Sequence, residues 1–213
     1  AIIRMGVPVS PRNIFPSNIQ GLPTWYEVRV SEAGWLGRSG GCDLMVALNP
    51  QTWDADVAGI DPGGYLFYDS TKHVPAEKLR DDITVIGVPL TAICAREFAD
   101  PNQRRLFKNI MYVGALAGLL DIDLAVVEAL IAQQYRGKDK LIDGNRQAAR
   151  IGYDYAREHF PAIGLRLQRA DAVGDRIFID GNSAAGLGAV YGGATVCAWY
   201  PITPSTSVVE AFT

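Results

Sequence analysis

Three short and nearly continuous apolar runs constrain the fold of this 213-residue chain more than any other feature. They are Asp43–Leu48, Gly64–Ser70 and Ile83–Leu90, and short polar or Gly/Pro-rich segments separate them. Runs of this kind are typical of strands covered by helices on both faces, as in a parallel sheet. A further strand is predicted over Tyr26–Val30. We therefore predict a layered α/β domain.

Helices are predicted to follow the strands. The first is apolar nearly all round and should be buried, the second begins after the capping residue Asp123, and the third is amphipathic and more exposed. Pro101 suits the first turn of the first helix. The segments are Arg104–Leu120, Leu124–Tyr135 and Lys138–Phe160. Between the strands, Asn49–Pro50 and Asp61–Gly63 predict turns or helix starts.

A change of composition after Phe160 predicts a second domain. Residues 161–175 contain proline, two glycines and mixed charges without a sustained apolar period, which indicates a linker. We expect a first domain over residues 1–160 and the start of a second α/β domain over residues 176–213. Its elements in order are a strand, a helix, a strand and a helix, at Arg176–Asp180, Gly181–Ala194, Thr195–Tyr200 and Pro204–Phe212.

The composition excludes several classes of protein. The net charge is −3, so nothing favours binding to nucleic acid or to an anionic membrane. The longest apolar run, Ile110–Leu120, is eleven residues and too short to span a membrane, and no secretion signal is found. Cys42, Cys94 and Cys197 are widely separated, so we expect no metal site and predict reduced, buried, cytoplasmic cysteines.

Glycines in the second segment raise the question of a nucleotide loop. The spacing Gly186–Gly188–Gly192 follows a predicted strand and resembles a loosened dinucleotide-binding motif, with Glu210 about twenty residues on. A helix capped by Asn182 or Ser183 would instead place these glycines inside a helix. Its small residues, such as Ala184 with Gly188 and Gly192, would then allow close packing. The packed helix is the favoured interpretation.

The segment Tyr200–Ser205 reads Tyr-Pro-Ile-Thr-Pro-Ser. Pro201 makes Tyr200 the predicted last residue of a strand, and Pro204 restricts Thr203 to extended geometry. Thr203 would thus lie between a strand end and a helix N-terminus, where α/β sheets bind ligands. A plain strand-to-helix turn capped by Ser205 or Thr206 explains the same residues, and the chemistry alone leaves both possibilities open.

Longer stretches carry a family resemblance. Gly181–Thr206, "GNSAAGLGAVYGGATVCAWYPITPST", resembles the start of the α subunit of 2-oxoacid:ferredoxin oxidoreductases, and YPITP is a signature of that family. Ser17–Gly37 through Leu106–Asp123 to about Tyr155 resembles the γ domain of the same enzymes. The order γ before α is similar to the fused large subunit of two-subunit forms, which are often specific for 2-oxoglutarate.

The resemblance implies an activity and its cofactors. Members of the family decarboxylate a 2-oxoacid oxidatively with coenzyme A as co-substrate, giving acyl-CoA (succinyl-CoA from 2-oxoglutarate), CO2 and reduced ferredoxin. Thiamine diphosphate with Mg2+ is shared with a smaller β subunit, which also holds the [4Fe–4S] cluster. The implied assembly is a homodimer of heterodimers that reduces ferredoxin. The γ-type domain is associated with coenzyme A, and the second domain begins a pyrimidine-binding α/β domain.

Site residues follow from the same resemblance. Thr203 matches the threonine that approaches the 2-oxoacid beside thiamine, and Tyr200, Pro201, Ile202, Pro204 and Ser205 would line or support that pocket. The glutamate that activates the aminopyrimidine is expected beyond Thr213, and Glu210 is not assigned this role.

This sequence also departs from the family pattern. A strand and a Gly-rich loop expected before Ala1 are missing, and Gln20–Pro23 replaces a common Arg-Gly-Gly. We therefore expect the chain to be a piece of a longer polypeptide. Alternatives are a non-catalytic structural or CoA-binding module, a pyruvate-type enzyme of the same family, and a dinucleotide-binding protein.

Overall fold

A computed structural model describes residues 1–14, 22–35, 37–38, 40–202 and 204–213. The chain forms two compact units, which are described separately. Unit 1 contains residues 1–10 and 28–173, and unit 2 contains residues 11–27 and 174–213. Outside the elements introduced below, the structure contains the 3-10 helices η1 (Ile2–Met5) and η2 (Ala76–Lys78) and a two-stranded sheet of β1 (Val9–Ile14) and β2 (Trp25–Val30).

A three-stranded parallel sheet forms the centre of unit 1. Its order is β3 (Cys42–Ala47), β4 (Ile60–Asp69) and β5 (Thr84–Val88). The register places Phe67 opposite Val46 on one side and Ile86 on the other. The parallel sheet predicted from the apolar runs is confirmed, and so is the α/β fold class.

Apolar side chains cover both faces of this sheet. Phe67 and Ile86 are buried in one cluster with Met111 of the helical layer. Leu66, which points to the opposite face, packs in a second cluster with Trp53 of α1 (Trp53–Ala58). Because successive residues of a strand alternate between faces, a stretch buried on both sides needs consecutive apolar residues, as Leu66 and Phe67 of β4 are.

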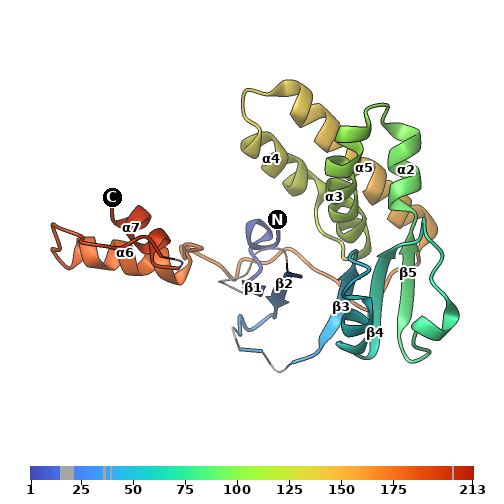
Figure 1. The fold of residues 1–213 in the computed structure, drawn as a ribbon, viewed down its shortest axis with the longest axis horizontal. Helices are drawn as coiled ribbons and strands as arrows, with labels where there is room; N and C mark the ends of the chain where they lie inside the picture. The colour runs from blue at the N-terminus through green and yellow to red at the C-terminus, as the bar shows by residue number, and fades with distance from the viewer. Residues whose placement is uncertain (15–21, 36, 39, 203) are drawn as a thin grey trace. The chain divides into compact units, whose positions relative to one another are not determined.

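Four helices come after β5 in the chain. They are α2 (Leu90–Glu97), α3 (Pro101–Leu119), α4 (Leu124–Gln134) and α5 (Asp139–His159). Figure 1 shows α3 and α5 side by side. Glycines make this contact possible, because a Cβ atom on Gly114 would lie 1.9 Å from the carbonyl oxygen of Ala149. The predicted start of α3 at Pro101 is confirmed, and Asp123 caps α4 by accepting a hydrogen bond from Ala125 N at 2.9 Å.

The prediction of a turn at Asp61–Gly63 is wrong, because these residues lie within β4. The strand tolerates them by an irregularity in its pairing with β3, between Cys42 and Leu44. Gly63 adopts a φ of 80°, which favours glycine, and its N–H reaches Asp82 O at 2.8 Å. The turn or helix start predicted at Asn49–Pro50 is confirmed, because Thr52 N donates to Asn49 O at 3.2 Å directly before α1, whereas α2 and β1 were not predicted.

The segment predicted as a linker is bonded to unit 1 over most of its length. Leu167 N donates to Leu120 O at 2.8 Å, Ala170 N to Met5 O at 2.9 Å, and Ala172 N to Gly6 O at 3.0 Å. Backbone pairing with the N-terminal residues fixes this segment along the unit, and the change of unit comes at residue 174.

Unit 2 contains α6 (Gly181–Tyr191) and α7 (Thr206–Phe212). The strands predicted at Arg176–Asp180 and Thr195–Tyr200 are wrong, since none occurs in the described part of unit 2 after residue 174. A strand requires a hydrogen-bonded neighbour, whereas the apolar pattern that predicts one does not. Ile177 and Val196 are 75% and 82% exposed, so packing does not hold these segments either.

Candidate functional site

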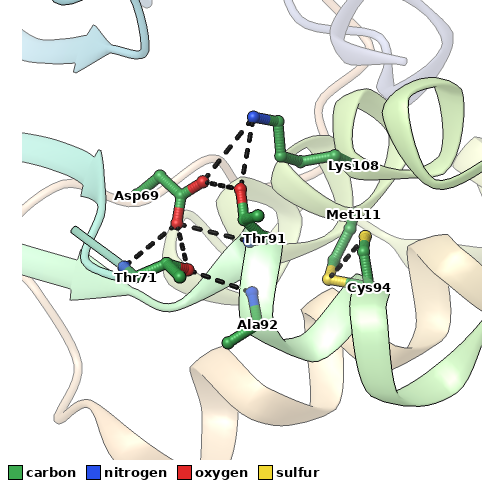
Figure 2. Close-up of polar contacts among 7 residues, drawn as sticks. All are labelled: Asp69, Thr71, Thr91, Ala92, Cys94, Lys108 and Met111. Atoms are coloured by element: carbon green, nitrogen blue, oxygen red, sulfur yellow. Dashed lines mark hydrogen bonds and ion pairs between the residues drawn. The ribbon is translucent and has the colours of Figure 1, made fainter. Parts of the chain in front are cut away.

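Asp69 gathers polar groups at the carboxyl end of the parallel sheet. It is the last residue of β4, and the following residues bring Thr71 back toward it. Its carboxylate accepts hydrogen bonds from Thr71 N and Oγ1 at 3.2 and 2.7 Å, and from Thr91 N and Oγ1 in the first turn of α2 (Figure 2). Thr71 Oγ1 in turn accepts from Ala92 N at 3.0 Å. The carboxylate therefore joins the end of β4 to the start of α2.

Lys108 of α3 completes this cluster. Its Nζ lies 3.6 Å from Asp69 Oδ2 and 3.4 Å from Thr91 Oγ1 (Figure 2). Partial burial alone would raise the pKa of Asp69, but the hydrogen bonds from Thr91 and Thr71 together outweigh burial and lower it. Asp69 is thus ionised at neutral pH and occupied as an acceptor. It positions Lys108, whose ammonium group is held loosely at the edge where α/β sheets bind ligands.

The thiol of Cys94, next to this cluster, is made unreactive by burial. Cys94 of α2 is buried, and its Sγ lies 3.9 Å from Met111 Sδ. Burial raises the pKa of Cys94 to about 11, so the thiolate is scarce at neutral pH. None of the three cysteines forms a disulfide in the described structure. The prediction of burial is confirmed for Cys94 and wrong for the exposed Cys197, while Cys42 is half-buried.

In unit 2, Asn182 holds the turn that precedes α7. Its Nδ2 donates to Pro204 O at 3.0 Å and lies 2.8 Å from Ser207 Oγ. Ser205 also closes the turn on itself, because both its N–H and its hydroxyl reach Ile202 O, at 2.8 and 2.6 Å. The backbone on both sides of position 203 is thereby fixed by side chains.

The predicted site residues are placed only in part. Thr203 lies outside the described residues. Tyr200 and Ile202 are 79% and 61% exposed, and Pro201 is exposed as well. The strand that should have ended at Tyr200 is absent from the described part of unit 2. Ser205 occupies the N-cap position of α7, but its side chain caps no helix N–H.

The glycine-rich helix differs from the prediction in detail. Gly186 and Gly188 lie inside α6, as the packed helix requires and as a nucleotide loop does not. The cap is Asp180, which accepts from Ser183 N at 2.9 Å, and not Asn182 or Ser183. The close contact is made at Gly186, where a Cβ would lie 2.5 Å from Val208 O. A Cβ on Gly188 would meet nothing within 4 Å.

Two features are absent from the part of the chain that the structure describes. No group of three or more His, Cys, Asp or Glu side chains is arranged to hold a metal ion. No helix is both long and apolar enough to cross a membrane.

Comparison with known proteins identifies the family. Residues 1–155 match the family model described as pyruvate ferredoxin/flavodoxin oxidoreductase, which is more than half of the chain. The chain belongs to this family. The resemblance to 2-oxoacid:ferredoxin oxidoreductases is thereby confirmed.

Several family relatives align with most of the chain. The α subunit of 2-oxoacid:ferredoxin oxidoreductase 2 from Aeropyrum pernix is 25% identical over 97% of this chain and 38% of its own length. The 2-oxoglutarate oxidoreductase subunit KorA from Mycobacterium tuberculosis is 23% identical over 87% of this chain and 32% of its own length. The chain therefore spans less than two fifths of these curated relatives.

Solved structures show the same fold. The 2-oxoglutarate:ferredoxin oxidoreductase from Magnetococcus marinus, with 2-oxoglutarate, coenzyme A and succinyl-CoA bound, has a TM-score of 0.81 and 27% identity. That match covers 98% of this chain and 36% of the other. The γ subunit of a keto/oxoacid ferredoxin oxidoreductase from Geobacter sulfurreducens has a TM-score of 0.53 over 72% of this chain and 83% of its own.

Sequence reasoning missed the residues that organise both sites. Asp69 and Thr91 are 22 residues apart, and so are Asn182 and Pro204. No spacing rule connects them, since each pairing depends on how distant segments pack. The position of Asp69 at the end of an apolar strand was the one available signal.

Proposed function

We propose that this chain is part of the large subunit of a 2-oxoacid:ferredoxin oxidoreductase that converts 2-oxoglutarate, coenzyme A and oxidised ferredoxin to succinyl-CoA, CO2 and reduced ferredoxin. The observation that carries the proposal is the match to the Magnetococcus marinus enzyme, at a TM-score of 0.81 over 98% of the chain. The name of that protein and the name of KorA support 2-oxoglutarate as the substrate.

Thr203 is proposed as the contact to the 2-oxoacid. Its hydroxyl would donate a hydrogen bond to the substrate carboxylate or oxo group and stabilise charge that develops there. The support is the YPITP signature together with the turn around it. Asn182 binds Pro204 and Ser205 binds Ile202, so the backbone beside Thr203 is pre-organised.

The side chains of this turn suit the aminopyrimidine ring of thiamine diphosphate. Tyr200 and Ile202 present exposed apolar side chains beside the fixed backbone, which is the type of surface against which an aminopyrimidine ring packs. When bound, the cofactor supplies the carbanion that adds to the 2-oxoacid. Residues of this chain would orient the substrate and exclude water. We assign the Mg2+ and diphosphate ligands to the partner subunit.

The γ-type part, residues 1–160, is proposed to associate with coenzyme A, followed by a linker over residues 161–175 and the start of the pyrimidine-binding domain over residues 176–213. Lys108 is the residue of this part that we assign to an anionic group, because Asp69 and Thr91 hold its ammonium at the carboxyl edge of the sheet. The proposed partners are a smaller β subunit with a [4Fe–4S] cluster and ferredoxin, in a cytoplasmic homodimer of heterodimers.

Purification of the native protein that carries this chain, together with its partner, tests the proposal. The complex is assayed for CoA-dependent reduction of methyl viologen with 2-oxoglutarate, pyruvate and 2-oxoisovalerate at equal concentration. The proposal expects 2-oxoglutarate to give the highest kcat/KM and the partner to contain iron. If pyruvate gives the highest kcat/KM, the assignment of 2-oxoglutarate as substrate is wrong and the protein is a pyruvate-type enzyme of the same family. If an iron-loaded complex reduces methyl viologen with none of the 2-oxoacids, the proposed activity is wrong, and the alternative of a non-catalytic structural or CoA-binding module is favoured.

A further inference from the structure

Unit 1 contains a cavity whose lining residues take no part in the sites described above. It has a volume of about 460 Å3 and lies among the end of α3, the end of α5 and the segment that follows α5. Its lining is divided in character, with charged side chains of Asp121, Arg157 and Arg166 and apolar side chains that include Leu119, Phe160 and Ile163. A volume of this size suits a small organic ligand.

The charged side of the cavity is built around Asp121. Its φ of 56° is the sole left-handed value of a non-glycine residue in the described part of the chain. The carboxylate lies between two guanidinium groups, 2.7 Å from Arg157 Nη1 and 3.0 Å from Arg166 Nε. This turn therefore holds two arginine side chains, from α5 and from the following segment, at one place.

The charges do not cancel. Two guanidinium groups and one carboxylate leave a net charge of +1 at the cavity. The arginine side chains are 53% and 62% exposed, so solvent and small solutes reach them. Arg157 Nη1 also approaches Gly118 O at 3.5 Å, whereas the terminal nitrogens of Arg166 donate to no residue that the structure describes. Donors for an additional anion are thus present.

We propose that this cavity binds a small organic monocarboxylate with an apolar body. A guanidinium group offers two parallel N–H donors that match a carboxylate, and Arg166 has both terminal nitrogens available for this. The apolar body would lie against Leu119, Phe160 and Ile163. Inorganic anions lack the apolar part, and neutral alcohols lack the charge, so each would make only one of the two kinds of contact. The inference does not depend on the activity proposed above.

Methyl-resolved NMR of the full chain tests the site with hexanoate as the probe. The signals to follow are the methyl groups of Leu119, Ile163 and Leu165, which line the cavity. Hexanoate is expected to shift them in a saturable manner. Hexanol, which has the same chain without the charge, is expected to bind at least tenfold more weakly, because a hydrogen bond to a charged group is lost.

Variants separate the charged and the apolar contribution. Arg166→Gln should lower the affinity for hexanoate by about tenfold. Arg105→Gln, at an exposed position of α3 outside the cavity, should leave that affinity unchanged. Ala162→Trp adds bulk at an exposed lining position and should abolish the shifts while both arginines remain. Shifts that do not saturate, equal affinity for hexanol and hexanoate, or an unchanged affinity in both lining variants would overturn the proposal.

Discussion

Replacement of Asp69 by Asn tests whether this carboxylate organises the carboxyl edge of the sheet. In the native chain Oδ1 accepts from Thr71 and from Thr91 N, and Oδ2 accepts from Thr91 Oγ1 and faces Lys108. Asn can place its amide oxygen where Oδ1 lies in Asp69, but its NH2 group then replaces Oδ2 and faces the Thr91 hydroxyl and the Lys108 ammonium group. The Asp69 side chain is 17% exposed, so water replaces these contacts poorly.

The magnitude follows from these contacts. One charge-assisted hydrogen bond is lost and an ammonium group loses its counter-ion, which together are worth about 2–3 kcal/mol. The Thr91 hydroxyl can rotate and accept a hydrogen bond from the new NH2 group, which recovers part of the loss and favours the lower end of that range. The readout is amide hydrogen exchange of Thr91 and Ala92, whose N–H groups donate to Asp69 and Thr71. At about 1.4 kcal/mol per tenfold, exchange should accelerate by roughly 30- to 150-fold.

A matched control and a pH series complete this test. Asp54→Asn removes an exposed ion pair with Lys78 and should change exchange in α2 by less than about twofold. The folded-state pKa of Asp69 is lowered, so its contribution is present above the unfolded pKa of about 3.9 and is lost as the pH falls through the folded pKa. The variant should lack this acid-dependent loss. Equal exchange rates in Asp69→Asn and the control would refute the role assigned to Asp69.

Two further predictions concern packing and thiol chemistry. Gly114→Ala places a Cβ 1.9 Å from Ala149 O and should destabilise unit 1 by up to about 2 kcal/mol in urea unfolding, since an overpacking cost of about 1–3 kcal/mol is offset by a gain of about 1 kcal/mol in helix propensity. Gly37→Ala, with nothing within 4 Å of the added Cβ, is the control, and similar unfolding of both variants would contradict the close contact. An aromatic disulfide reagent at pH 8 should label the exposed Cys197 within minutes and the buried Cys94, with its pKa raised to about 11, only on unfolding, so fast labelling of Cys94 in the native chain would disprove its burial.

Elements that depend on local pattern could be predicted from the sequence. The runs around Phe67 and Ile86 identify strands buried on both faces, and a parallel sheet follows from that pattern. Pro101 and Asp123 mark helix starts, because Pro101 fixes a helical φ in the first turn and the Asp123 carboxylate accepts a hydrogen bond from the N–H of Ala125.

Elements that depend on distant partners could not be predicted. Arg176–Asp180 has an apolar pattern typical of a strand but no strand pairs with it in the described part of the chain. Asp61–Gly63 has turn chemistry, yet the irregular pairing of β4 accommodates it. The contacts of Asp69 with Thr91 and of Asn182 with Pro204 each bridge 22 residues, and only the folded arrangement of helices and strands brings these partners within reach.

The assignment of Thr203 can be tested most directly in the complete enzyme with its partner subunit. Thr203→Ala should lower kcat for 2-oxoglutarate by about 100-fold or more, because a donor to developing charge is removed, while the affinity for thiamine diphosphate should change little. Thr203→Ser should retain most of the turnover, and Thr206→Ala, three positions on, should behave as the native enzyme. Turnover by Thr203→Ala equal to that of the native enzyme would contradict the proposed contact between this chain and the 2-oxoacid.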